Sequence, residues 1–358
     1  MEWSKKRAAP LFDLANSNIL PCSIDELPGA REALDFEGSN YDGYAPLIDA
    51  IAARYGVAPA QVTTAQGASG ANFLVCAALL EPGDEVLVET PGYDPLFGTP
   101  RLFGVQVNRF TRRFADGYAI DPDRIRAAMT PRTRLIIVTS PHNPSGVVSD
   151  AIALKEVGAI AESHNAHVLL DEVYLDAAAI SSPAAAAQAV AARSRADAFV
   201  STNSLTKSYG LSGLRCGWII SSTDVAERIR RARDVVDGNG SIVAERLAAL
   251  AFTHLDHLRA RTAALLDTNG RLIREFLDSR RADLEWIPAG GTVAFPRLQR
   301  IDDASAFAER LLEMHQTAVV PGRFFQAPAH VRIGFGGATD PLRGGLQALG
   351  VALDELRD

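Results

Sequence analysis

The chain of 358 residues is poor in cysteine and has no surplus of basic residues. Its three cysteines, Cys22, Cys76 and Cys216, are scattered and show no CxxC spacing, which argues against a disulfide framework and a structural zinc site. We therefore expect no metal site. The formal net charge is -7. Because nucleic-acid binding usually requires a basic face, we expect that DNA and RNA are not partners.

Long apolar runs are absent as well. No stretch of about 18 apolar residues is free of charge, which argues against a membrane-spanning helix. No apolar run follows Met1 and the charged residues behind it, so the sequence predicts no signal peptide. We expect a cytoplasmic protein that does not bind membranes.

The chain does contain short apolar runs that alternate with helical patterns. Five runs read as strands, at residues 85–89, 134–139, 166–171, 198–202 and 216–221. They are apolar on both faces, which is typical of parallel strands that helices cover on both sides. The sequence therefore predicts an α/β fold with a large, mostly parallel sheet.

A second, smaller domain is indicated by the weaker alternation after about residue 225. A long helical region runs to about residue 280, and isolated strands follow near residues 292–295, 318–320 and 330–335. We expect an arm at residues 1–40 that contributes to the small domain and to the active-site entrance. A large domain at 41–245 and a small α+β domain at 246–358 follow it.

Polar side chains stand where three of these strands end. Asn143 lies in Ser-Pro-His-Asn-Pro-Ser-Gly at residues 140–146, and Asp171 and Tyr174 bound the segment Asp-Glu-Val-Tyr. Lys207 follows the strand at 198–202, in a segment that ends with Arg215. Because ligands bind outside the carboxyl ends of parallel strands, we expect an amide, an acid, a phenol and an amine at one edge of the sheet.

Each of these residues has an ordinary interpretation when taken alone. Asn143 between two prolines is more often a turn residue, and Asp171 at a strand end is more often a helix N-cap. Tyr174 is more often a half-buried aromatic, and Arg215 a surface ion pair. Their joint placement at strand ends favours a functional site over these alternatives.

Three ordered motifs, at residues 140–146, 171–174 and 204–215, resemble those of the class I and II aminotransferases, which are fold-type-I pyridoxal-phosphate enzymes. The third motif reads Ser-x-x-Lys-x-x-Gly-x-x-x-x-Arg. The resemblance extends from Tyr41 to Arg332. It implies an enzyme that moves an amino group between an α-amino acid and a 2-oxo acid, in a homodimer with shared active sites.

The resemblance also implies roles around the ring of pyridoxal phosphate. Lys207 would hold the cofactor as a Schiff base and move the substrate proton. Asp171 would pair with the ring nitrogen, which keeps the ring an electron sink. Asn143 and Tyr174 would bond the phenolic oxygen, and Tyr93 would stack on the ring, although a core tyrosine is the alternative for Tyr93.

The cofactor phosphate would lie at the start of the helix after Gly67, where free N–H groups and the helix dipole favour an anion. The residues that match the phosphate ligands of the family are Ala68, Ser69, Gly70, Ser204 and Arg215. Tyr41 matches the tyrosine that reaches the phosphate of the neighbouring subunit.

On the substrate side, Arg332 matches the arginine that clamps the α-carboxylate with its planar fork, rather than a surface arginine on an edge strand. Asn143 and Asn18 complete the expected substrate contacts. Residues 14–18, Leu-Ala-Asn-Ser-Asn, replace a glycine-containing loop of the family. For acidic substrates, the candidates for a second arginine are Arg231 and Arg233.

The motifs do not separate amino transfer from other reactions of the same fold. A β- or γ-eliminating lyase, or a cyclopropane-forming synthase, would use Lys207, Asp171 and Arg332 in the same way. A cofactor-sensing regulator is a remote alternative. It would need a DNA-binding module ahead of the fold, and about 40 residues are too few for one.

Overall fold

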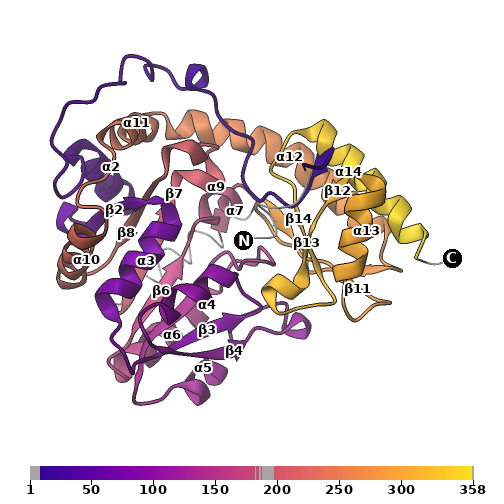
Figure 1. Cartoon of the computed structure of the whole chain (residues 1–358), viewed down its shortest axis with the longest axis horizontal. Helices are drawn as coiled ribbons and strands as arrows, with labels where there is room; N and C mark the ends of the chain where they lie inside the picture. Colours follow the sequence, from indigo (N-terminus) through magenta and orange to yellow (C-terminus); the bar gives the residue numbers. More distant parts are fainter. Residues whose placement is uncertain (1–8, 182, 185–186, 188–196, 357–358) are drawn as a thin grey trace.

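A computed structural model describes residues 9–356 except 182, 185–186 and 188–196, so the first eight residues of the predicted arm lie outside it. Its largest feature is a seven-stranded sheet (Figure 1). The strands lie in the order β2 (Val62–Gln66), β8 (Cys216–Ile220), β7 (Phe199–Ser204), β6 (His167–Asp171), β5 (Thr133–Thr139), β3 (Glu85–Thr90) and β4 (Gln106–Thr111). Neighbours from β7 to β4 are parallel, as the predicted α/β fold requires.

β8 is an exception to the predicted parallel arrangement. It runs antiparallel to both β2 and β7. Only residues 205–215 connect β7 to β8, whereas a crossover to a parallel neighbour takes a dozen or more residues. The expectation of a parallel strand at residues 216–221 is therefore wrong in direction. The strands β2 and β4 are not among the five that the apolar pattern predicts.

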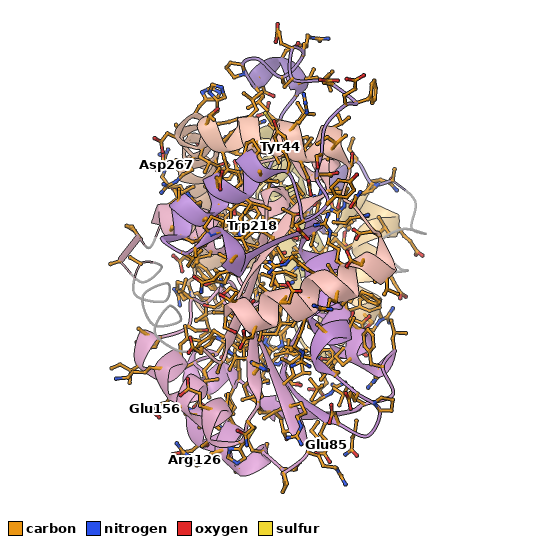
Figure 2. The ribbon with its side chains drawn as sticks, turned by 90° about the vertical axis from the view of Figure 1, so that its left-hand side faces the viewer. Tyr44, Glu85, Arg126, Glu156, Trp218 and Asp267 are labelled. Carbon is orange, nitrogen blue, oxygen red and sulfur yellow. The ribbon has the colours of Figure 1, made fainter. Side chains whose placement is uncertain are left out.

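Helices cover both faces of the sheet because successive strand residues point to opposite sides. Val86 and Val88 share a core with α3 (Gly67–Leu79), α4 (Asp94–Arg101) and α10 (Thr223–Val236). Leu87, between them, shares the opposite core with α5 (Pro122–Ala128) and α6 (Ala151–Ser163). Trp218 of β8 lies in the interior (Figure 2), in a core with α2 (Ala45–Tyr55) and α11 (Ile242–Thr253).

A smaller unit built from the C-terminal part of the chain lies beside the large sheet (Figure 1). Its helices are α12 (Leu255–Ser279), α13 (Ser305–His315) and α14 (Thr339–Asp354). Its strands are β10 (Val293–Ala294), β14 (Val331–Gly334) and β13 (Val320–Pro321), with the pairs β9 (Leu284–Glu285) and β11 (Arg297–Leu298), and β1 (Phe12–Asp13) and β12 (Thr317–Ala318). The β1–β12 pair joins the N-terminal arm to this unit.

The change from one core to the other falls within α12. Leu258, near its start, packs in the core with α2 and α11, whereas Ile273 and Leu277 pack in the core with α13 and α14. The predicted boundary after residue 245 lies inside α11, so we propose a boundary within α12, and the division into domains stays a prediction. No helix in the described part of the chain is long and apolar enough to span a membrane.

Candidate active site

The carboxyl ends of β5, β6 and β7 face a cavity of about 540 Å³ that residues of both units line. The predicted site residues that line it are Asn18, Ala68, Ser69, Tyr93, Asn143, Asp171, Tyr174, Ser204, Lys207, Arg215 and Arg332. Gly70 and Tyr41 are not among the lining residues. Residues far apart in sequence thus meet at one edge of the sheet, as the motif order predicts.

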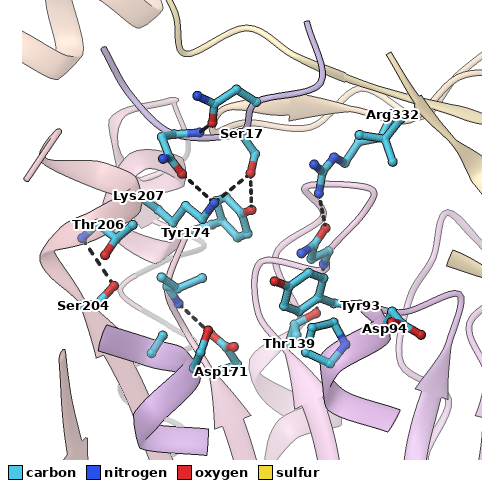
Figure 3. A pocket seen from close by; sticks show the side chains of 18 of the residues that line it. Ser17, Tyr93, Asp94, Thr139, Asp171, Tyr174, Ser204, Thr206, Lys207 and Arg332 are labelled. Atoms are coloured by element: carbon cyan, nitrogen blue, oxygen red, sulfur yellow. Dashed lines mark hydrogen bonds between the residues drawn. The ribbon is translucent and has the colours of Figure 1, made fainter. Parts of the chain in front are cut away.

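Lys207 extends into this cavity from α9 (Leu205–Ser208), a single turn after β7 (Figure 3). Its Nζ donates to Ser17 Oγ at 2.9 Å and to Asn18 Oδ1 at 2.6 Å, and lies 5.6 Å from the centre of the Tyr174 ring. Ser17 Oγ is also 2.8 Å from Tyr174 Oη. The arm therefore holds the amine through two side chains, and Asn18, expected on the substrate, contacts the lysine.

Asp171 ends β6 as a buried carboxylate. Its Oδ2 accepts a hydrogen bond from Asn72 Nδ2 at 2.9 Å, and its Oδ1 accepts one from the Val173 backbone at 3.1 Å. Thr202 Oγ1 in turn donates to Asn72 Oδ1 at 2.7 Å, which fixes the amide. Burial raises the pKa of Asp171, since an apolar surrounding disfavours its charged form, while the Asn72 hydrogen bond opposes this shift. A cation at this position would stabilise the carboxylate.

Donors for an anion gather at the start of α3. The first N–H groups of a helix have no partner within it, and Ala68 and Ser69 in this turn line the cavity. Thr206 adds a buried hydroxyl that has no hydrogen-bond partner in the described part of the chain. Arg215 supplies a cation, and a Cβ at Gly67 would collide with its guanidinium.

These residues fit pyridoxal phosphate. The orphaned Thr206 hydroxyl, the start of α3 and Arg215 suit its phosphate. The buried Asp171 suits its ring nitrogen, and Lys207 is the only amine among the described lining residues. Tyr93 forms part of the wall, and burial raises the pKa of its phenol to about 12, so the ring stays neutral.

Arg332 lies on β14, which is the central strand of its three-stranded sheet and not an edge strand. The side chain is buried, and its Nη1 donates to Asn143 Oδ1 at 3.1 Å while Nη2 donates to the Ala15 carbonyl at 3.0 Å. Burial lowers the pKa of Arg332. The side chain of Asn143 thus contacts Arg332 instead of the backbone of its own turn. Figure 3 shows Arg332 across the cavity from Lys207.

Neither arginine considered for a second carboxylate lines this cavity. Arg231 is exposed and pairs with Glu227. Arg233 is buried and lines a separate cavity of about 290 Å³, close to Asp237 and Glu245. The expectation that either one faces the substrate from its own subunit is therefore wrong, because α10 directs Arg231 to solvent and Arg233 into the separate cavity.

Some lining residues carry no local sequence signal. Ser17 meets Lys207 across 190 positions, and Asn72 meets Asp171 across 99. Thr206 had a weak signal, since it stands one residue before Lys207 and two after Ser204. Thr139, the last residue of β5, had the same signal as other strand-end residues, but a threonine there also fits a buried strand.

Comparisons with known proteins agree with this geometry. The family model described as aminotransferase class I and II matches residues 13–349. Capreomycidine synthase of Streptomyces vinaceus is 35% identical over 97% of this chain and 91% of its own length. A PLP-dependent aminotransferase from Streptococcus suis superposes with a TM-score of 0.89 at 26% identity, covering 99% of this chain and 96% of that one. The PLP-dependent cyclase OrfR gives 0.85 at 29% identity, with 99% and 96% covered.

Proposed function

Because the chain belongs to the class I and II aminotransferases and is a pyridoxal-phosphate-dependent enzyme, we propose that it transfers an amino group from an α-amino acid to a 2-oxo acid. One observation supports this activity best. The amine of Lys207 and the guanidinium of Arg332 face one cavity from different units, and Asn143 contacts Arg332 there. Pyridoxal phosphate, when bound, supplies a carbonyl carbon that joins to amines and a ring that accepts the electrons of the broken Cα–H bond.

In this proposal each residue has one task. Lys207 Nζ anchors the cofactor and moves the proton at the substrate Cα, first as a base and then as an acid. Asp171 holds positive charge at the ring nitrogen. Arg332 binds the α-carboxylate through two N–H groups and thereby orients the Cα–H bond. Asn143 and Tyr174 bind the phenolic oxygen.

The charges around the cavity also bear on the amino donor. Once Lys207, Arg215 and Arg332 have these tasks, no further cation remains among the lining residues that the structure describes. Three carboxylates line the same cavity, and beside Asp171, which is assigned to the ring nitrogen, these are Asp13 and Asp94. Like charges repel, so we propose that donors with neutral or cationic side chains are used in preference to aspartate and glutamate.

A second candidate function is cyclisation of an amino acid. Capreomycidine synthase has the higher sequence identity of the relatives described above, and a cyclase is among the similar solved structures. The Cα–H step and the residues for it would be the same. The two reactions differ in the fate of the amino nitrogen, which leaves the carbon skeleton in transfer and stays on it in cyclisation.

The fate of the nitrogen therefore tests the proposed function. The loaded enzyme is incubated with a 2-oxo acid and a panel of donors that carry ¹⁵N at the α-position, including aspartate, alanine and arginine. We expect the label in a new amino acid built on the acceptor skeleton, with less from aspartate. Labelled ammonium would indicate elimination, and a labelled product on the donor skeleton would indicate cyclisation. Either result, without label in the acceptor, contradicts transfer.

We further propose a homodimer with shared sites, supported by large apolar side chains that are exposed on the arm and on α10. Phe36, Tyr41 and Val235 are 88%, 75% and 87% exposed. Asn239, which follows α10, has its side-chain amide 3.3 Å from the Tyr41 carbonyl, so the arm and the end of α10 meet. Such apolar exposure marks interfaces in soluble proteins, and Tyr41 would reach the phosphate site of the second copy.

Complementation between two defective variants tests this dimer. Lys207→Ala and Tyr41→Ala are each expected to impair both sites of a homodimer. A mixed dimer holds one site with native Lys207 from one copy and native Tyr41 from the other, so co-expression is expected to restore up to half of the wild-type activity per dimer. A monomer in sedimentation, or no recovery in isolated mixed dimers, would contradict the shared site.

A further inference from the structure

A fully buried ion pair lies beside the candidate site. Arg112 follows β4 directly, and its Nη1 is 2.8 Å from Glu89 Oε2 on β3, with both side chains completely buried. Burial raises the pKa of Glu89 and lowers the pKa of Arg112, so each charge is disfavoured by its surroundings. Buried pairs of this kind seldom add stability relative to apolar side chains, which suggests that the pair has another task.

Thr139 connects this pair to the site. Glu89 Oε1 accepts from the Thr139 backbone N–H at 2.8 Å and from its hydroxyl at 2.5 Å. The same hydroxyl accepts from the Asn143 backbone N–H at 2.9 Å. A carboxylate only accepts and a backbone N–H only donates, so the single hydroxyl proton must point to Glu89. The direction of both hydrogen bonds is therefore fixed.

Asn143 links these hydrogen bonds to Arg332, the proposed substrate clamp. Its Oδ1 accepts from Arg332 Nη1 at 3.1 Å, which leaves its NH₂ group to donate into the cavity. The contacts thus run from Arg112 through Glu89 and Thr139 to Asn143, and from there to Arg332 in the other unit. They cross three neighbouring strand ends, since β5, β3 and β4 are adjacent in the sheet.

We propose that Glu89, Arg112 and Thr139 are positioning residues for recognition of the substrate α-carboxylate. They fix the backbone of Asn143, and through the Asn143 side chain they hold the guanidinium of Arg332 in one orientation. The proposal rests on the proposed function, because it takes Arg332 as the carboxylate clamp. The affinity of Arg332 for the carboxylate then depends on the Thr139 hydroxyl, which does not itself contact the carboxylate.

The decisive variant is Thr139→Val, which keeps the shape of the side chain and removes the hydroxyl. Thr139→Ser restores the hydroxyl. The matched control is Thr63→Val, because Thr63 is a buried strand threonine whose hydroxyl has no hydrogen-bond partner in the described part of the chain. Binding of 2-aminoisobutyrate to the loaded protein is measured by cofactor absorbance. This probe has an α-carboxylate but no Cα–H, so its binding needs no turnover.

We expect Thr139→Val to weaken binding of the probe about ten-fold, the usual size for a lost hydrogen bond to a charged group. Thr139→Ser and Thr63→Val are expected to bind it like the wild type. With substrate, KM should rise more than kcat falls. The proposal would be overturned if Thr139→Val bound the probe as tightly as the wild type. It would also be overturned if Thr139→Ser lost as much affinity for the probe as Thr139→Val.

If Thr139→Val does not fold, a second variant tests the same proposal. Glu89→Gln keeps one acceptor oxygen but places an amide against Arg112, and it is expected to weaken probe binding in the same way. Unchanged binding in Glu89→Gln would overturn the proposal independently. Because the probe reports binding alone, failure of amino transfer and failure of this positioning role give different results.

Discussion

Replacing Lys207 by alanine is expected to lower amino transfer by about 10⁴-fold or more, because one residue both anchors the cofactor and moves the proton. Lys207 Nζ is the only amine among the described residues that line the cavity, so no other side chain there takes over. The variant should still bind pyridoxal phosphate, since the start of α3, Thr206 and Arg215 remain. Its cofactor absorbance should lack the band of a protonated Schiff base.

The matched control for this variant is Lys155→Ala. Lys155 lies on α6 and is exposed, so its loss should change neither the absorbance nor the rate. Amino transfer at the wild-type rate by Lys207→Ala would overturn the assignment of this residue. Loss of cofactor binding together with a lower melting temperature would show that the replacement had damaged the fold, and Lys207→Arg would then be compared.

Replacing Arg332 is expected to have the second-largest effect. Arg332→Ala should raise KM for the amino acid about 100-fold, in keeping with the loss of one partner from a buried charged pair. Cofactor binding should stay unchanged, because Arg332 lies on β14 and the phosphate donors lie at the start of α3. Arg332→Lys should recover only part of the affinity, since an ammonium lacks the two-point geometry of a guanidinium.

Arg297→Ala is the control for Arg332, because Arg297 belongs to the same unit but is half exposed on β11. KM and kcat are measured for all three variants, with cofactor retention followed by absorbance. If Arg332→Ala bound the cofactor weakly but kept the wild-type KM for the amino acid, this arginine would belong to the phosphate site instead of the carboxylate site. A small change in both constants would remove it from the site.

The parts of the site that the sequence predicts share one physical cause. In a parallel sheet, residues that end consecutive strands meet at one edge, and Asn143, Asp171 and Lys207 all end or follow such strands. The residue types indicate what chemistry these side chains can perform, and the order of the strands predicts that they lie close together. The family resemblance is confirmed by the family model over residues 13–349, and with it the fold and the cofactor.

The contacts that the sequence did not reveal are long-range. Ser17 binds Lys207 because the arm crosses from β1 to the large sheet, and nothing near Ser17 signals this path. Apolar periodicity indicates burial and not strand direction, so it does not predict that β8 is antiparallel. The short connection from β7 to β8 does indicate this direction. Arg233 is a candidate only through its position in the sequence, and that position does not tell which cavity a buried side chain faces.

The most direct test of the central claim is reduction of the loaded wild-type protein with borohydride, followed by peptide mass spectrometry. Borohydride converts a Schiff base into a stable secondary amine, so the cofactor stays attached to the lysine that held it. We predict the added mass on the peptide that contains Lys207, and none on the peptide that contains Lys155. Attachment at another lysine, or no attachment to a protein that has bound pyridoxal phosphate, would contradict a site built on Lys207.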